Sequence, residues 1–240
     1  MTHRVLMVVS SRERLGETDR PTGAWLEELA ASYYVFLNAG FDIELASPRG
    51  GKAPIDPLSL DDPWITADGR RFVADAAAQA KLAATLSLAV VKPERYRTIY
   101  LVGGAATAWD FSNNLELTSI VESLHRGGRP VAGVCHGVLG LTNARDAAGV
   151  ALVHGRNVTG ISNAEEVMTG FDKLVPVLPE DRLRGLGGRY SCAAPFESHV
   201  MVDAGVLTGQ NPASAGPLAH AVLKELARTE TASAASEARR

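Results

Sequence analysis

The chain has very few cysteines. Among 240 residues there are only Cys135 and Cys192, and neither belongs to a C-x-x-C pair. Two cysteines so far apart do not form a disulfide framework, and they lack the paired spacing of a structural zinc site. The six histidines are scattered without ligand spacing. We therefore expect no metal and no cofactor.

Excess positive charge and long apolar runs are also missing. The formal net charge is −3 and no basic run occurs, so we expect no nucleic-acid partner. The apolar run at residues 4–11 is too short for a signal-peptide core or a membrane span. These absences predict a cytoplasmic protein without a membrane partner, in which free thiols stay reduced.

The composition is that of a globular protein with one sizeable core. Hydrophobic residues make up 46% and charged residues 21% of the chain. A chain of this length buries a core without disulfides, and no linker or repeat divides it. We predict a single domain over residues 1–230 and a flexible C-terminal tail over residues 231–240.

Apolar runs and helical patterns alternate along the chain, which predicts an α/β fold. Such alternation is typical of a doubly wound parallel sheet with helices on both faces. The expected strands are 4–11, 41–47, 98–104, 130–134 and 156–162, with a hairpin at 199–209; the expected helices are 22–38, 73–88, 114–128, 180–188 and 217–227. Active sites in such folds lie beyond the carboxyl ends of the strands.

One connection is too long to be a plain loop. Residues 48–72 are rich in Pro, Gly and Asp and contain Trp64. Loops of this length are often functional. We expect this segment to form either a lid or the contact between two subunits.

The candidate nucleophile lies where an apolar strand ends. Residues 133–137 read G-V-C-H-G, the spacing of a nucleophile elbow with Cys135 in place of serine. The flanking glycines suit a sharp turn in which side chains would clash. A helix beginning at His136 would direct N–H groups at the sulfur, favouring the thiolate and offering an oxyanion site. The alternative for Cys135 is a buried structural cysteine, and for His136 a surface turn residue.

The chain resembles the ThiJ/PfpI superfamily, whose fold is flavodoxin-like and similar to that of class I glutamine amidotransferases. The resemblance spans nearly the full length, and it is closest to the glutathione-independent glyoxalase III branch, to which chaperone-like and protein-repair activities are also linked. The motifs that carry it are "VLMVVSS", "PTGAWLEELA", "YLVGG", "VAGVCHG", "VTGISNAEE" and "LTGQNPASA".

The resemblance implies two acidic partners for the cysteine and histidine. Glu28 matches the acidic residue that lies against the cysteine in the family, with Glu27 as its neighbouring competitor. Glu166 matches the acid that completes the Cys135-His136 pair, with Glu165 as its competitor. Periodicity alone does not single out any of these carboxylates.

The chain departs from the family in two places. Many relatives have a histidine after the glycine pair, whereas this chain reads Ala105-Ala106 after Gly103-Gly104, so a polar group that binds substrate is missing. No histidine is followed two residues later by glutamate, so the H-x-E of a true class I glutaminase is absent.

The resemblance implies conversion of methylglyoxal or a related 2-oxoaldehyde to a 2-hydroxyacid. Cys135 would form a hemithioacetal, Glu28 or His136 would move the proton, and Glu166 would hold His136. The substrate-binding and oxyanion positions expected are Gly103, Gly104 and Gly137. The partner is then a small carbonyl compound, with a homodimer as the assembly. A cysteine hydrolase or hydratase of amides or isonitriles, and a redox-sensing stress protein, are the alternatives.

Overall fold

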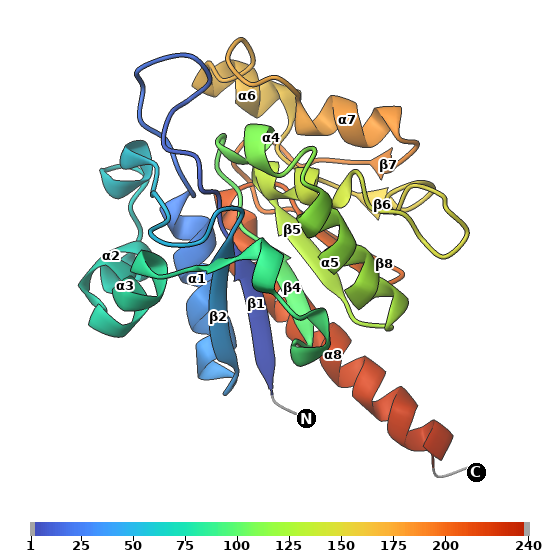
Figure 1. Ribbon diagram of the computed structural model, residues 1–240. Helices are drawn as coiled ribbons and strands as arrows, with labels where there is room; N and C mark the ends of the chain where they lie inside the picture. Colours follow the sequence, from blue (N-terminus) through green and yellow to red (C-terminus); the bar gives the residue numbers. More distant parts are fainter. Residues whose placement is uncertain (1–2, 238–240) are drawn as a thin grey trace.

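The computed structural model describes residues 3–237, with side chains through residue 231. A single seven-stranded sheet runs through its centre in the order β3-β2-β1-β4-β5-β9-β8 (Figure 1). The strands are β1 (Arg4–Val8), β2 (Asp42–Ser47), β3 (Leu86–Ser87), β4 (Thr98–Leu101), β5 (Val131–Val134), β8 (Val200–Asp203) and β9 (Val206–Gly209).

Every pair of neighbouring strands in this sheet is parallel except β8 with β9, which form the predicted antiparallel hairpin. The order β2-β1-β4-β5-β9 is that of flavodoxin-like folds. The predicted strand at 156–162 is shorter than expected and lies outside this sheet: β6 (Asn157–Val158) pairs instead with β7 (Arg189–Tyr190).

Helices cover both faces of the sheet, as the α/β pattern predicts. The helices α1 (Leu26–Asn38) and α8 (Ala215–Glu237) pack on one face and on each other, and α5 (Leu115–Arg126) packs on the other (Figure 1). The remaining α-helices are α2 (Ala67–Ala74), α3 (Ala76–Ala83), α4 (Thr107–Asp110), α6 (Asn163–Thr169) and α7 (Pro179–Gly185). The 3-10 helices are η1 (Pro57–Leu60), η2 (Leu88–Val90), η3 (Pro93–Arg95), η4 (Cys135–Leu141) and η5 (Pro212–Ser214).

Strand β1 is apolar from Val5 to Val8 because both of its faces are buried. Alternate residues of a strand point to opposite faces, so Val5 and Met7 of β1 belong to the core beneath α1 and α8. Leu6 and Val8 of the same strand belong to the core beneath α5. All four side chains are 0% exposed, which explains the continuous apolar run in the sequence.

The helix predicted over residues 73–88 is wrong in its boundaries. The Asp75 carboxylate accepts hydrogen bonds from the N–H groups of Ala77 and Ala78, so it caps α3 and separates it from α2. The helix α3 then ends at Ala83, and a short strand, β3, follows. A single polar cap outweighs the high helix propensity of alanine here.

The segment 48–72 is partly structured. It contains η1 and the beginning of α2, and Trp64 lies between them. At the other end of the chain, α8 extends into the predicted tail, residues 231–240, and ends at Glu237. Residues 238–240 lie outside the described residues, and the flexibility of the tail stays a prediction. Within the described part, no helix has the length and apolar character needed to cross a membrane.

Candidate active site

Two neighbouring strands bring the predicted residues to one edge of the sheet. β4 is followed by Gly103-Gly104 and β5 by Cys135, and the two strands pair in parallel, so their carboxyl ends meet. Cys135 is the first residue of η4 and has a φ of 56°. A non-glycine residue with positive φ is uncommon and is typical of a nucleophile held on a sharp turn. The predicted elbow is present, but a 3-10 helix follows it.

The glycines beside the cysteine are required by close packing. A Cβ added to Gly137 would lie 2.4 Å from the carbonyl oxygen of Leu101, and one added to Gly133 would lie 3.0 Å from Cα of Val138. These glycines allow β4, β5 and the turn after Cys135 to approach one another. The clash expected from the sequence is therefore real, and it fixes the position of the elbow.

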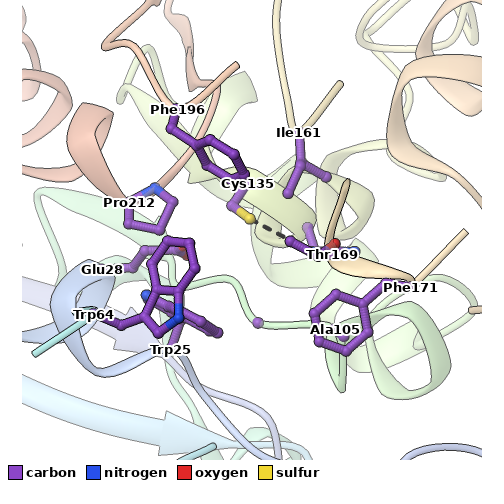
Figure 2. A pocket seen from close by; sticks show the side chains of 12 residues that line it. Trp25, Glu28, Trp64, Ala105, Cys135, Ile161, Thr169, Phe171, Phe196 and Pro212 are labelled. Atoms are coloured by element: carbon purple, nitrogen blue, oxygen red, sulfur yellow. Dashed lines mark hydrogen bonds between the residues drawn. The ribbon is translucent and has the colours of Figure 1, made fainter. Parts of the chain in front are cut away.

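Cys135, His136 and Glu166 form a chain of contacts inside the protein. The Cys135 sulfur lies 3.4 Å from Nδ1 of His136, a contact drawn as a dashed line in Figure 2. Nε2 of His136 lies 2.7 Å from Oε1 of Glu166, and the two side chains are 2% and 0% exposed. Nε2 and both Glu166 oxygens have no aligned hydrogen-bond partner among the described residues, so this pair is a close buried contact. The order sulfur, imidazole, carboxylate is that of a catalytic triad.

Glu28 faces the sulfur from α1. Its Oε2 accepts a hydrogen bond of 2.8 Å from the N–H of Gly103, and the side chain is 0% exposed. Among the described residues, Oε1 has no hydrogen-bond partner. Burial raises the pKa of Glu28 to about 8, against the lowering effects of Cys135 and the Gly103 N–H. The carboxyl therefore holds a proton at neutral pH.

Glu27, the competitor of Glu28, has a different place. Its carboxylate accepts a hydrogen bond from the hydroxyl of Thr66, the residue that caps α2. Successive residues on a helix point in different directions, so only one of the two carboxyls reaches the cysteine. The match of Glu28 to the family's acid agrees with this geometry.

The predicted lowering of the Cys135 pKa is wrong. Burial, and then the negative charge of Glu28, raise the pKa of this thiol well above its usual range. A proton on Glu28 removes its negative charge and supplies a hydrogen-bond donor to the sulfur, so the two titrations are coupled.

Cys135, His136 and Glu28 line a small pocket with largely apolar walls (Figure 2). The cavity volume of the pocket is about 40 Å³, enough for a few non-hydrogen atoms. The ring centre of Trp64 lies 5.6 Å from that of Trp25, in an edge-on arrangement, and 5.7 Å from that of Phe196. The segment 48–72 therefore supplies part of the pocket wall. The lining residues are Trp25, Glu28, Trp64, Gly104, Ala105, Cys135, His136, Ile161, Thr169, Phe171, Phe196 and Pro212.

The three predicted glycines have separate places. Gly104 lines the pocket, with a φ of 110°, and a Cβ there would lie 2.4 Å from the carbonyl oxygen of Gly23. Gly103 instead donates its N–H to Glu28, so that N–H is not available to an oxyanion. Gly137 packs against Leu101 outside the lining. Ala105, the first of the two alanines that follow the glycine pair, does line the pocket.

Glu165, the competitor of Glu166, belongs to another network. Together with Ser162 it forms a capping box at the start of α6, and it accepts hydrogen bonds from Phe196, Gln210 and Asn211 as well. The S-x-x-E spacing of residues 162–165 is a sequence signal for such a cap. The contacts to the distant residues have no sequence signal.

The second cysteine is not part of this site. Cys192 is exposed, whereas Cys135 is buried, and Cys192 does not line the pocket. Over residues 3–237, no group of three or more His, Cys, Asp or Glu side chains has the arrangement of a metal site. The expectation of a metal-free protein stays a prediction.

The fold and this pocket define a flavodoxin-like α/β protein with a buried cysteine, histidine and two glutamates at the carboxyl ends of parallel strands. The profile of the DJ-1/PfpI family matches residues 22–225, and the chain belongs to that family. The family resemblance seen in the sequence is confirmed.

Relatives match over almost the whole chain. The structure of the Rapid Encystment Protein 24 kDa of Francisella tularensis is 35% identical with a TM-score of 0.89, covering 94% of this chain and 99% of that one. The glutathione-independent glyoxalase HSP31 of Saccharomyces cerevisiae is 26% identical over 88% of this chain and 93% of its own. The structure of glyoxalase III from Candida albicans, at 22% identity, has a TM-score of 0.83 over 94% and 98% of the two chains and agrees in fold.

Proposed function

We propose that the protein converts methylglyoxal, or a 2-oxoaldehyde of similar size, to the 2-hydroxyacid without glutathione. Support comes from the relatives named glutathione-independent glyoxalase, which match over most of the chain. The observation that carries the proposal is the buried Glu28 carboxyl beside the Cys135 sulfur in a pocket of only about 40 Å³, where burial raises the pKa of Glu28 to about 8. Such a pocket suits a substrate of few atoms, and a thiol within the protein replaces that of glutathione.

The first step is addition of sulfur to the aldehyde carbon. His136, whose Nδ1 lies 3.4 Å from the sulfur, takes the thiol proton as the C–S bond forms. Glu166, 2.7 Å from the other ring nitrogen, stabilises the positive charge on the imidazole. Glu28 gives its proton to the aldehyde oxygen, and the product is a neutral hemithioacetal with Glu28 now ionised.

The second step moves hydrogen within the substrate. The ionised Glu28 takes the proton from C1, which leaves an enediolate, and the hydroxyl proton at C1 moves to the oxygen at C2. Glu28 then gives its proton to C2, so C1 becomes a thioester carbonyl and C2 a secondary alcohol. Burial of Glu28 keeps bulk water away from this transfer. In the last step the ionised Glu28 takes a proton from water as the water oxygen adds to the thioester carbon, and the protonated His136 gives its proton to the leaving sulfur. This releases the 2-hydroxyacid and restores the thiol, the protonated Glu28 and the neutral His136. The sum is addition of one water to the 2-oxoaldehyde.

The test is formation of lactate from methylglyoxal by purified protein in the absence of glutathione and any other small thiol. We expect lactate equal to the methylglyoxal consumed and no increase in rate on adding glutathione. Consumption without lactate, or a strict need for glutathione, would refute the proposal. Release of ammonia from simple amides, measured in parallel, tests the hydrolase alternative.

A further inference from the structure

The loop between β7 and β8 forms a wall of the pocket although it has no regular structure. Phe196 of this loop lines the pocket, and its ring lies 5.7 Å from that of Trp64. The Phe196 backbone has a φ of 64°, a region that bulky residues rarely adopt. A conformation of this kind persists only when the surroundings hold it in place.

The surroundings that hold Phe196 converge on Glu165. Oε1 of Glu165 accepts a hydrogen bond of 2.8 Å from the N–H of Phe196. The same oxygen accepts from the Asn211 side chain at 2.8 Å, while Oε2 accepts from the Gln210 side chain at 2.9 Å. Oε2 also accepts from the N–H and the hydroxyl of Ser162, at 3.0 and 2.7 Å. Every one of these partners donates, so both oxygens act only as acceptors.

This carboxylate ties together three parts of the pocket wall. Glu165 bonds Ser162, which follows Ile161, and Asn211, which precedes Pro212, and it bonds Phe196 directly. Ile161, Pro212 and Phe196 all line the pocket. Glu165 is 0% exposed and does not itself line the pocket. It therefore acts on the site only through the residues that it holds.

The loop is fastened at further points to the same segment. The Ala193 N–H donates to the Gln210 side chain at 2.8 Å, and the Asn211 side chain donates to the carbonyl of Glu197 at 2.7 Å. With the Glu165 bonds, these contacts fix residues on both sides of Phe196. The ring is thus held over the side of the pocket where Cys135 lies (Figure 2).

We propose that Glu165 is a positioning residue which, by holding the Phe196 backbone, sets the size of molecule that can reach the Cys135 sulfur. The inference rests on the proposed role of Cys135 as nucleophile. Loss of the Glu165 bonds frees Phe196 to leave its strained conformation, and the pocket then opens to larger molecules.

The test measures access to Cys135 with two thiol reagents of different size. Cys192 is first replaced in every protein by Cys192→Ser, so that Cys135 is the remaining thiol. The rate of alkylation by iodoacetamide is compared with that by the bulkier N-phenylmaleimide. The variants are Glu165→Gln and Phe196→Ala. Glu165→Gln replaces one accepting oxygen by an amide N–H2 group that faces the groups which donate to Glu165, and Phe196→Ala removes the ring. Glu197→Gln is the matched control, since this exposed carboxyl lies in the same loop.

We expect Glu165→Gln and Phe196→Ala to raise the ratio of bulky to small reagent rates by at least about tenfold, the scale of a hydrogen bond to a charged group. Glu197→Gln should leave the ratio unchanged. The ratio of kcat/KM for phenylglyoxal to that for methylglyoxal should rise in the same two variants. If Glu165→Gln does not fold, Glu165→Asp, which keeps the acceptors but shortens their reach, should raise the ratio by a smaller factor.

The outcomes separate this inference from the proposed function. A ratio of alkylation rates that rises in Phe196→Ala but stays fixed in the Glu165 variants would overturn the positioning role. Equal falls in the rates of both reagents in the Glu165 variants would overturn it as well. If the ratio rises while no variant, nor the parent, converts methylglyoxal, Glu165 keeps its role and the proposed substrate fails.

Discussion

Nε2 of His136 lies 2.7 Å from Oε1 of Glu166, with both side chains buried at the end of β5. On its other side, the ring faces the sulfur of Cys135 at 3.4 Å. In the proposed mechanism this carboxylate holds the ring proton on Nε2, which leaves Nδ1 to accept the thiol proton. Cys135 and His136 are adjacent in the sequence, both lie in η4, and their side chains contact each other.

Glu166→Gln should lower kcat by about 10²- to 10⁴-fold, because an amide cannot stabilise the imidazolium that forms when His136 takes the thiol proton. KM should change little, since Glu166 does not line the pocket. Steady-state kinetics with methylglyoxal provide the measurement. A variant whose kcat is unchanged would remove Glu166 from the relay.

Glu28→Gln should cost at least about a hundredfold in kcat, the low end for general acid–base catalysis. The amide can still accept from the Gly103 N–H but cannot shuttle a proton. Glu27→Gln is the matched control, because Glu27 contacts Thr66 and lies outside the pocket lining. Equal losses in the two variants would indicate an effect on α1 rather than on the chemistry.

The pH dependence of stability should report the raised pKa of Glu28. This pKa is about 8 in the folded protein against 4.5 for the free side chain. The folded state therefore keeps a proton that the unfolded chain releases, and the resulting stabilisation is complete below about pH 4.5 and lost as the pH rises through about 8. The free energy of unfolding of the parent, relative to Glu28→Gln, should fall between about pH 5 and about pH 9. A constant difference across this range would show that Glu28 is ionised throughout.

Gly137→Ala should destabilise the fold by about 1–3 kcal/mol or more, the cost of overpacking, because the new methyl group would meet the Leu101 carbonyl. Gly185→Ala is the control. A Cβ at Gly185, the last residue of α7, meets nothing within 4 Å, so this change should be neutral or slightly stabilising. Chemical denaturation measures both, and equal stabilities would contradict the close packing behind the elbow.

A homodimer remains a prediction from the family resemblance, and closed symmetric dimers are the commonest oligomers. Light scattering at micromolar concentration should give about twice the mass of the 25.4 kDa chain. A mass of one chain would overturn it.

The placement of Trp64 in the pocket wall favours a lid over a subunit contact for the segment 48–72.

The sequence predicts the layers of the fold well because apolar periodicity reports burial directly. It also locates Cys135, since the G-x-C-x-G spacing has a steric cause. It fails over residues 73–88, where the Asp75 cap acts against local propensity. The choice of Glu28 over Glu27 came from the family match, because both residues flank the same apolar face.

The parts of the site that could not be predicted depend on distant contacts. Phe196 enters the wall because Glu165, 31 positions earlier, accepts its N–H. The raised pKa of Cys135 depends on burial and on Glu28, which lies on another element. Neither relationship leaves a local pattern in the chain.

The most direct test of the account compares Cys135→Ser with Cys192→Ser in lactate formation from methylglyoxal without glutathione, with the fold of each variant checked by circular dichroism. Cys135→Ser should be folded and inactive, while Cys192→Ser should keep the parent's rate, because Cys192 is exposed and outside the pocket. Lactate formed at the parent's rate by folded Cys135→Ser would contradict the central claim that this sulfur is the nucleophile.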